Sequence, residues 1–236
     1  MRKFLKKKTQ KPKESIQENQ VADVPKESSI KEQTTEEKEF DAFFSETLRR
    51  FPQKTSSMIL KTYDTSKQQA EKILAKSQDQ FEGLFEEFLK GADEQTRKKC
   101  HTTIHAATLT AAIIGCSPIP FSDAFLLVPV QLTMMARLHK IFGQSWSESL
   151  GKSVSKELVV VSLGKSAVGN IVKVVPGVGT ITGAAINATV ASTITEALGW
   201  ITVKMLNDGE DIFDDVMSFK GQVQTLTKLL RQSKKK

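Results

Sequence analysis

Residues 105–124, HAATLTAAIIGCSPIPFSDA, contain the strongest indication of the architecture of this protein. The first part of this stretch consists of small and apolar residues without a formal charge, and Pro118 and Pro120 then interrupt it. A proline lacks the backbone donor that a helix needs and disfavours helix at the residue before it. The stretch therefore predicts a buried helix that ends in a turn at residues 117–121.

A second apolar run follows the turn and predicts the returning arm of a helical hairpin. Ser122 or Asp123 can cap this arm, and Pro129 predicts a kink or a delayed start. The basic residues at the two open ends of the hairpin are Arg97, Lys98, Lys99, Arg137 and Lys140. In a bilayer this pattern would keep both ends cytoplasmic. The apolar content suits a buried core, a shallow insertion and a span about equally well.

A later stretch repeats the pattern more loosely and predicts a second hairpin. An apolar arm near residues 158–163 leads to a break at residues 175–179, and a long arm of low charge follows over residues 180–206. Two glycines four residues apart let helix backbones approach closely, and Asn187 is expected to tie helices together by a hydrogen bond. The residues predicted to form the turns and close contacts of both hairpins are Ser117, Pro118, Pro120, Phe121, Asp123, Pro176, Gly177, Gly179, Gly183 and Asn187.

Charge is unevenly distributed along the 236 residues. Residues 1–99 hold 21 Lys or Arg and 18 Asp or Glu, whereas residues 100–207 hold only 7 and 4. We therefore expect the first part to be exposed to solvent and the second part to be buried away from water. An all-α fold is expected in three regions. They are a disordered polar and basic tail over residues 1–35, charged amphipathic helices over 36–95, and an apolar helical hairpin domain over 96–236.

Amphipathic helices are expected on both sides of the apolar stretches. The first begins near Glu36 and ends at Pro52, because its phenylalanines recur at helical spacing. A longer helix is expected from about Thr55 to Leu89, and the first hairpin arm opens near Asp93. A last amphipathic helix covers about residues 210–231.

No catalytic, cofactor or metal motif is complete in this sequence. Two Gly-Lys-Ser triplets occur, but the glycine that a phosphate loop needs five residues earlier is replaced by Trp146 in one and by Val159 in the other. His101 and His105 share a helix face, but a zinc protease would need glutamate where this chain has Thr102. We therefore expect no enzyme activity, no catalytic residue, no cofactor and no metal site.

The ends and the cysteines indicate the cellular setting. Seven basic residues and no acid lie in residues 1–13, and no apolar segment follows, so this is not a secretory signal. The basic start can bind anionic lipid or simply keep the chain in solution. Cys100 and Cys116 fit a reducing compartment. The expected location is the cytoplasmic face of the inner membrane, or the cytoplasm.

Two motifs in this order resemble the bacterial domain-of-unknown-function family 697. The first is the stretch 105–124 followed by LVPVQ, residues 127–131, and the second is VPGVGTITGAAINA, residues 175–188, which runs on to TEALG at 195–199. The resemblance implies a helical module linked to membranes or to GTPases, because in that family the domain often follows a small GTPase domain. Residues 1–96 contain no phosphate loop, so GTP hydrolysis is not implied here.

Two functions are compatible with these patterns. The first is a non-enzymatic membrane-associated helical protein, integral or peripheral, that serves as an accessory to a separate GTPase. The second is a soluble helical bundle that acts as a protein-interaction scaffold, with the hairpins forming its own core. Membrane lipid is the main expected partner, and a GTPase and a second copy of the chain are further candidates. Neither nucleic acid nor a small-molecule substrate is expected, because the sequence shows no aromatic–basic platform and no substrate motif.

Overall fold

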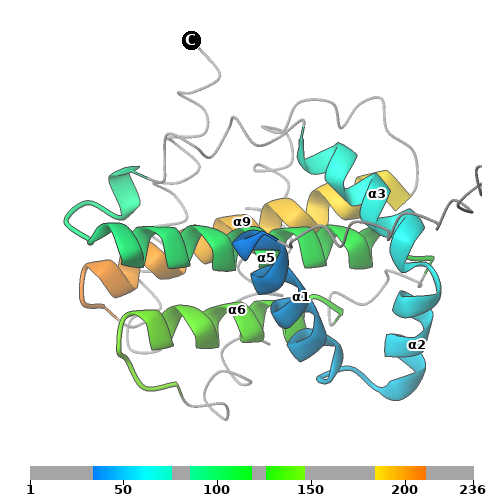
Figure 1. Ribbon diagram of the computed structural model, residues 1–236, viewed down its shortest axis with the longest axis horizontal. Coiled ribbons are helices and arrows are strands. Elements are labelled where there is room, and N and C mark those ends of the chain that lie inside the picture. Colours follow the sequence, from blue (N-terminus) through cyan, green and yellow to red (C-terminus); the bar gives the residue numbers. More distant parts are fainter. Residues whose placement is uncertain (1–33, 76–85, 119–125, 147–183, 211–236) are drawn as a thin grey trace, which may run out of the picture. The chain divides into compact units, whose positions relative to one another are not determined.

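The regular secondary structure of the described residues is entirely helical (Figure 1). The computed structural model describes residues 34–75, 86–118, 126–146 and 184–210. Its helices are α1 (Thr35–Leu48), α2 (Gln53–Lys61), α3 (Tyr63–Leu74), α5 (Glu94–Cys116), α6 (Val128–Ile141) and α9 (Ala184–Asn207). The all-α prediction is confirmed. The predicted break at 175–179 and the helix predicted over 210–231 lie outside the described residues, apart from position 210.

Helix α1 begins at a capping box. The Thr34 side chain accepts a hydrogen bond from the Glu37 backbone N–H at 3.2 Å, and the Glu37 carboxylate accepts one from the Thr34 N–H at 2.8 Å. These contacts satisfy two of the donors that a helix start leaves unpaired. The predicted start near Glu36 is confirmed, but α1 ends at Leu48, and Pro52 instead precedes the first residue of α2.

The single long helix predicted from Thr55 to Leu89 is wrong. Within it the chain forms α2 and α3, which are separated at Thr62, where φ is −113° and ψ is 10°. The Thr62 hydroxyl donates back to the carbonyls of Met58 and Ile59, and such local bonds compete with the helical ladder. After the break, α3 packs against α5 and α9.

The first arm of the predicted hairpin is α5, and its ends are where the sequence placed them. The Asp93 carboxylate accepts a hydrogen bond from the Thr96 N–H at 3.0 Å and caps the start. Ser117 ends the helix with extended backbone, φ −67° and ψ 143°. Helix α6 begins only at Val128, with Pro129 in its first turn, so the delayed start is confirmed.

Helices α5 and α9 run antiparallel and touch through glycine. A β-carbon on Gly115 would lie 2.6 Å from the Ala188 Cα, and one on Gly199 would lie 2.9 Å from Ile104 Cγ1. The second contact is eleven residues earlier than the first on α5 and eleven residues later on α9. Opposite directions of travel define an antiparallel pair, and Figure 1 shows the two helices side by side.

Small and polar side chains fill the seam between α5 and α9. The same register places Thr108 opposite Thr195, and Ala111 opposite Ser192, and all four residues are buried. Short side chains at positions three and four apart allow the two backbones to pack more closely than leucine or phenylalanine would permit. The closest pairing therefore joins one arm of the first predicted hairpin to one arm of the second.

Helices α1, α3 and α6 pack around the α5–α9 pair. Helix α6 packs on both α5 and α9, α1 lies against α5 and α6, and α3 lies against α5 and α9. The buried apolar residues form one continuous cluster, which extends from Phe40 on α1 to Leu206 on α9. The charged amphipathic helices and the apolar helices therefore share a single core.

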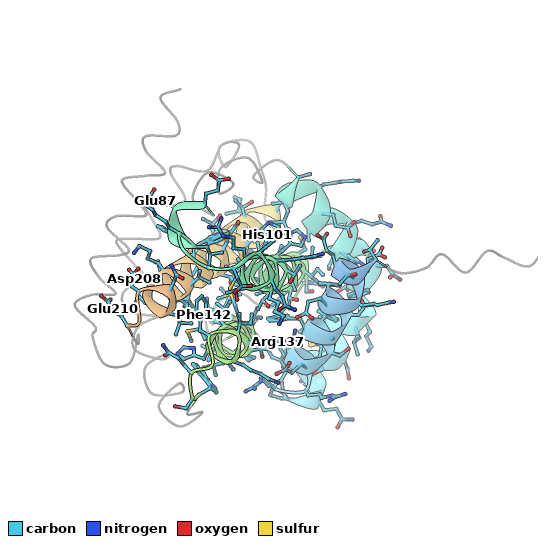
Figure 2. All side chains as sticks on the ribbon, turned by 60° about the vertical axis from the view of Figure 1, so that its left-hand side comes forward. Glu87, His101, Arg137, Phe142, Asp208 and Glu210 are labelled. Atoms are coloured by element: carbon cyan, nitrogen blue, oxygen red, sulfur yellow. The ribbon has the colours of Figure 1, made fainter. Side chains whose placement is uncertain are left out.

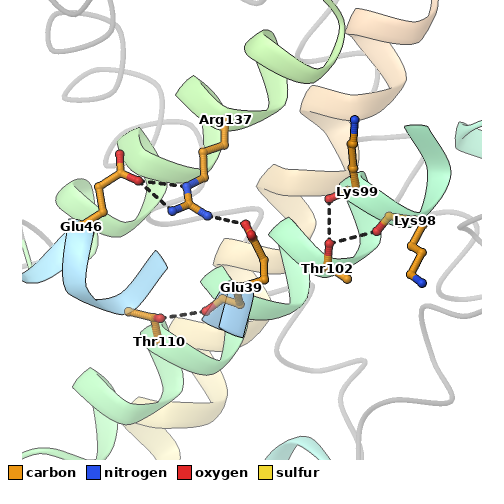
Figure 3. Close-up of polar contacts among 8 residues, drawn as sticks. Glu39, Glu46, Lys98, Lys99, Thr102, Thr110 and Arg137 are labelled. Carbon is orange, nitrogen blue, oxygen red and sulfur yellow. Dashed lines mark hydrogen bonds and ion pairs between the residues drawn. The ribbon is translucent and has the colours of Figure 1, made fainter. Parts of the chain in front are cut away.

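The guanidinium of Arg137 on α6 forms hydrogen bonds and ion pairs with two glutamates of α1. Arg137 donates from Nε and Nη2 to Glu46 Oε2 at 3.0 and 2.8 Å, and from Nη1 to the Glu39 carboxylate (Figure 3). Its Cζ also lies 5.1 Å from the centre of the Phe43 ring. These side chains remain partly exposed, so the contact contributes on the order of 1 kcal/mol and mainly fixes where α1 crosses.

Gly115→Ala tests the close approach of α5 and α9. Alanine is better than glycine in a helix by about 1 kcal/mol, but here its methyl group meets backbone atoms that cannot rotate away. We expect the free energy of unfolding, measured by urea denaturation, to fall by roughly 1–3 kcal/mol.

Gly199→Ala is the matched control. A β-carbon at Gly199 meets only side-chain atoms of Ile104 and Met134, which can adjust. Its effect on the free energy of unfolding should stay within about 1 kcal/mol. Equal losses in both variants, or a gain for Gly115→Ala, would contradict the proposed packing.

Candidate functional site

Three of the ten predicted motif residues lie in the described part of the chain, and all three are at the same end of the helices. Ser117 is buried, and its hydroxyl donates to the Ile113 carbonyl at 2.9 Å. Pro118 is exposed beside it. Asn187 is half-buried in the first turn of α9. The motif residues outside the described ranges are Pro120, Phe121, Asp123, Pro176, Gly177, Gly179 and Gly183.

Asn187 contributes to the contact between α5 and α9 through its backbone and not through its side chain. A β-carbon on Gly115 would lie 2.9 Å from the Asn187 carbonyl carbon. Among the described residues, the Asn187 side chain has no hydrogen-bond partner on another helix, so the predicted amide bond is not observed there. The glycine that permits close approach is Gly115 on the opposite helix. Gly115 is not one of the ten predicted motif residues.

One end of the α5–α6–α9 core carries no formal charge. Residues 101–118, 126–136 and 184–195 contain no Asp, Glu, Lys or Arg. Because α9 runs antiparallel to α5 and α6 follows α5 after a short connection, these three uncharged segments converge at one end, on the right in Figure 1. We call it the uncharged end, and it comprises the last turns of α5 and the first turns of α6 and α9.

The opposite end carries charges of both signs. Figure 2 brings that end forward and shows Glu87, Asp208 and Glu210 there, together with His101 and Phe142. The Lys204 ammonium near the end of α9 forms an ion pair with Asp208, one residue beyond the helix, and Lys98 and Lys99 are exposed at the start of α5. Solvated charge at one end and none at the other give the core a polarity along its axis.

Three threonine hydroxyl groups in the core form hydrogen bonds back to their own helices. Thr110 donates to the Ala106 carbonyl at 2.8 Å, Thr189 to Ala185 at 2.8 Å and Thr202 to Leu198 at 2.8 Å. Figure 3 shows the Thr110 bond. This pairing satisfies the polar group without a second helix, and so threonine can occupy an apolar face at little cost.

Glu196 is the acidic residue nearest the uncharged segment of α9. Desolvation raises its pKa to about 8, and a hydrogen bond with the Trp200 side chain opposes the shift. A carboxyl group with this pKa is largely protonated at neutral pH. Its presence extends the uncharged character of α9 toward Trp200.

The two histidines of α5 lie on one face, as their spacing predicted. The His101 and His105 rings are stacked, with centroids 6.4 Å apart and an interplanar angle of 5°. Desolvation lowers the pKa of His105, and the neighbouring His101 lowers it further. Within the described ranges, no three His, Cys, Asp or Glu side chains gather in a way that could hold a metal ion.

An open depression of about 410 Å³ lies between α1, α3 and α5, beside His105. Its charged lining residues are Glu36, Glu37, Lys67 and Glu71. Lys67 Nζ lies 5.0 Å from the centre of the Phe40 ring, which stabilises that cation in place. The charges have both signs and project from exposed helix surfaces, so they do not converge on one ligand chemistry.

The sequence of this chain matches a known protein family. A family model described as "Domain of unknown function (DUF697)" matches residues 66–233, more than half of the chain. The chain belongs to the DUF697 family. The predicted resemblance is confirmed, and the match extends beyond the two motifs at residues 105–131 and 175–199 to include most of α3.

One relative of known name matches part of the chain. Magnetosome membrane protein 22 of Magnetospirillum gryphiswaldense is 33% identical over 110 residues, which are 45% of this chain and 56% of that protein. The chain therefore spans little more than half the length of this relative. No solved structure matches the chain. Among the described helices, none combines the length and the apolar character needed to cross a bilayer.

The cysteines provide a test of the closed core. Burial raises the pKa of Cys100 to about 12 and that of Cys116 to about 11. The thiolate is the reactive form, so both thiols should resist maleimide at neutral pH in the native protein and react rapidly in urea. Mass spectrometry of the labelled protein measures this. Native labelling as fast as that of a free cysteine would show that the core is open.

Glu196 predicts a pH-dependent stability. The folded pKa of about 8 lies above the ordinary value of 4.5, so the fold favours the protonated form. The contribution is therefore fully present below about pH 4.5 and is lost as the pH rises to about 8. Glu196→Gln should remove this decline in urea unfolding curves, whereas the exposed Glu71→Gln should retain it. A decline that is unchanged in Glu196→Gln would mean that another group causes it.

Proposed function

We propose that this DUF697 protein is a membrane-associated helical protein that works by binding and not by catalysis. The observation that carries the proposal is the polarity of its core, in which three helices lose all formal charge toward one end. Charged side chains are costly near hydrocarbon, so a charge-free surface is what a lipid-facing region requires. The similarity to magnetosome membrane protein 22 supports the same setting.

The mode of association proposed is peripheral. The apolar residues of α5 face α1, α3, α6 and α9, and Ile104, Ile113 and Ile114 are at most 2% exposed. Inserting α5 as a span would require these contacts to be broken. Attachment through the surface leaves the core intact. The cytoplasmic face of the membrane, a separate GTPase as partner, and self-association stay predictions.

Membrane fractionation tests the proposal. The full chain should sediment with membranes from its own cells, and alkaline carbonate should release it, because the core stays folded on the surface. Detergent would be needed for release if the hairpins were embedded. Recovery of all the protein in the supernatant before any wash would contradict membrane association.

The alternative is a soluble helical bundle that acts as a protein-interaction scaffold. The observation in its favour is that α5 and α9 use their small residues to pack against each other inside the protein. The same fractionation distinguishes the two functions. A monodisperse protein that stays in the supernatant without detergent would favour the scaffold.

A further inference from the structure

Two large apolar side chains are exposed among the described residues. Leu60 on α2 is 54% exposed, and Ile186 in the first turn of α9 is 36% exposed. In Figure 1, α2 lies at the same end of the long axis as the first turns of α9 and the last turn of α5. Pro118 is also exposed there.

The segment that leads into and forms α2 is basic. Residues 49–61 contain Arg49, Arg50, Lys54 and Lys61 and no acidic residue. Lys54 and Lys61 are exposed along with Leu60, and Ile59 faces the core, fully buried. One short helix thus presents two ammonium groups and an apolar side chain to solvent, and hides its opposite face.

We propose that the end formed by α2, Pro118 and the first turn of α9 is a docking surface for an anionic phospholipid bilayer. Leu60 and Ile186 enter the boundary between headgroups and acyl chains, and Lys54 and Lys61 bind lipid phosphates. The inference rests on the proposed membrane association and adds its orientation.

Lipid is the occupant that the charges favour. Basic residues near an anionic membrane are attracted to the lipid phosphates, and apolar side chains beside them add burial in the interface. The uncharged segments beside α2 have no side chain that must be neutralised as the bilayer approaches. The far end carries charges of both signs, among them Glu87, Asp208, Lys98 and Lys99, so it lacks the acid-free basic character of residues 49–61.

Fluorescent labels at the two ends test the orientation. Leu60→Cys and Gln95→Cys place an environment-sensitive nitrobenzoxadiazole label on α2 and on the exposed first turn of α5, respectively. Cys100 and Cys116 are buried and should remain unlabelled. On mixed phosphatidylcholine and phosphatidylserine vesicles, the label at 60 should brighten and shift to the blue, and the label at 95 should not change.

Charge removal tests the same surface in the unlabelled full chain. Lys54→Gln with Lys61→Gln should weaken binding to these vesicles by about tenfold or more. Lys98→Gln with Lys99→Gln removes the same charge from exposed positions at the other end and should leave binding nearly unchanged. The basic residues 1–13 are present in every protein, so a difference between the pairs reports on α2. Circular dichroism checks that both pairs keep the fold.

The outcomes separate the orientation from the function. If the unmodified chain binds neither these vesicles nor native membranes, the proposed function fails. If it binds but the two lysine pairs weaken binding equally, or the label at 95 changes and that at 60 does not, the docking surface is wrong and membrane association stands.

Discussion

The backbone contact between Gly115 and Ala188 is the constraint on which the rest of the structure depends. It sets the distance between α5 and α9, and together with Gly199 against Ile104 it fixes their direction and register. Helix α6 can contact both only because they lie so close. Helices α1 and α3 then cover the remaining faces. A protein interior is packed too densely to absorb even one additional methyl group at a backbone crossing.

Local signals made several parts of this fold predictable. The capping residue Asp93, the end at Ser117 and the delayed start before Pro129 each depend on neighbours within one turn, which the sequence displays. The break at Thr62 was missed because it depends on where α3 must pack. The pairing of α5 with α9 was missed for a related reason. Small residues at a spacing of four show that a helix can pack closely against another helix, but they do not identify which helix that is.

The candidate site was predictable in composition and not in geometry. The absence of charge in residues 101–118 and 184–195 can be read directly, whereas their convergence at one end depends on the antiparallel register. The hydrogen bond from Arg137 to Glu46 joins residues 91 positions apart, and no local sequence pattern indicates it. The raised pKa of Glu196 likewise arises from the helices packed around it. A core with one charge-free end is thus a consequence of tertiary structure.

A nuclear Overhauser experiment on the isotopically labelled full chain tests the α5–α9 register directly. The antiparallel register predicts cross-peaks between the α-protons of Gly115 and the backbone protons of Ala188, and between Ile104 methyl groups and the α-protons of Gly199. Both contacts are required for the antiparallel register. Cross-peaks from Gly115 to the last turn of α9, near Leu206, would contradict the register and with it the convergence of the uncharged segments.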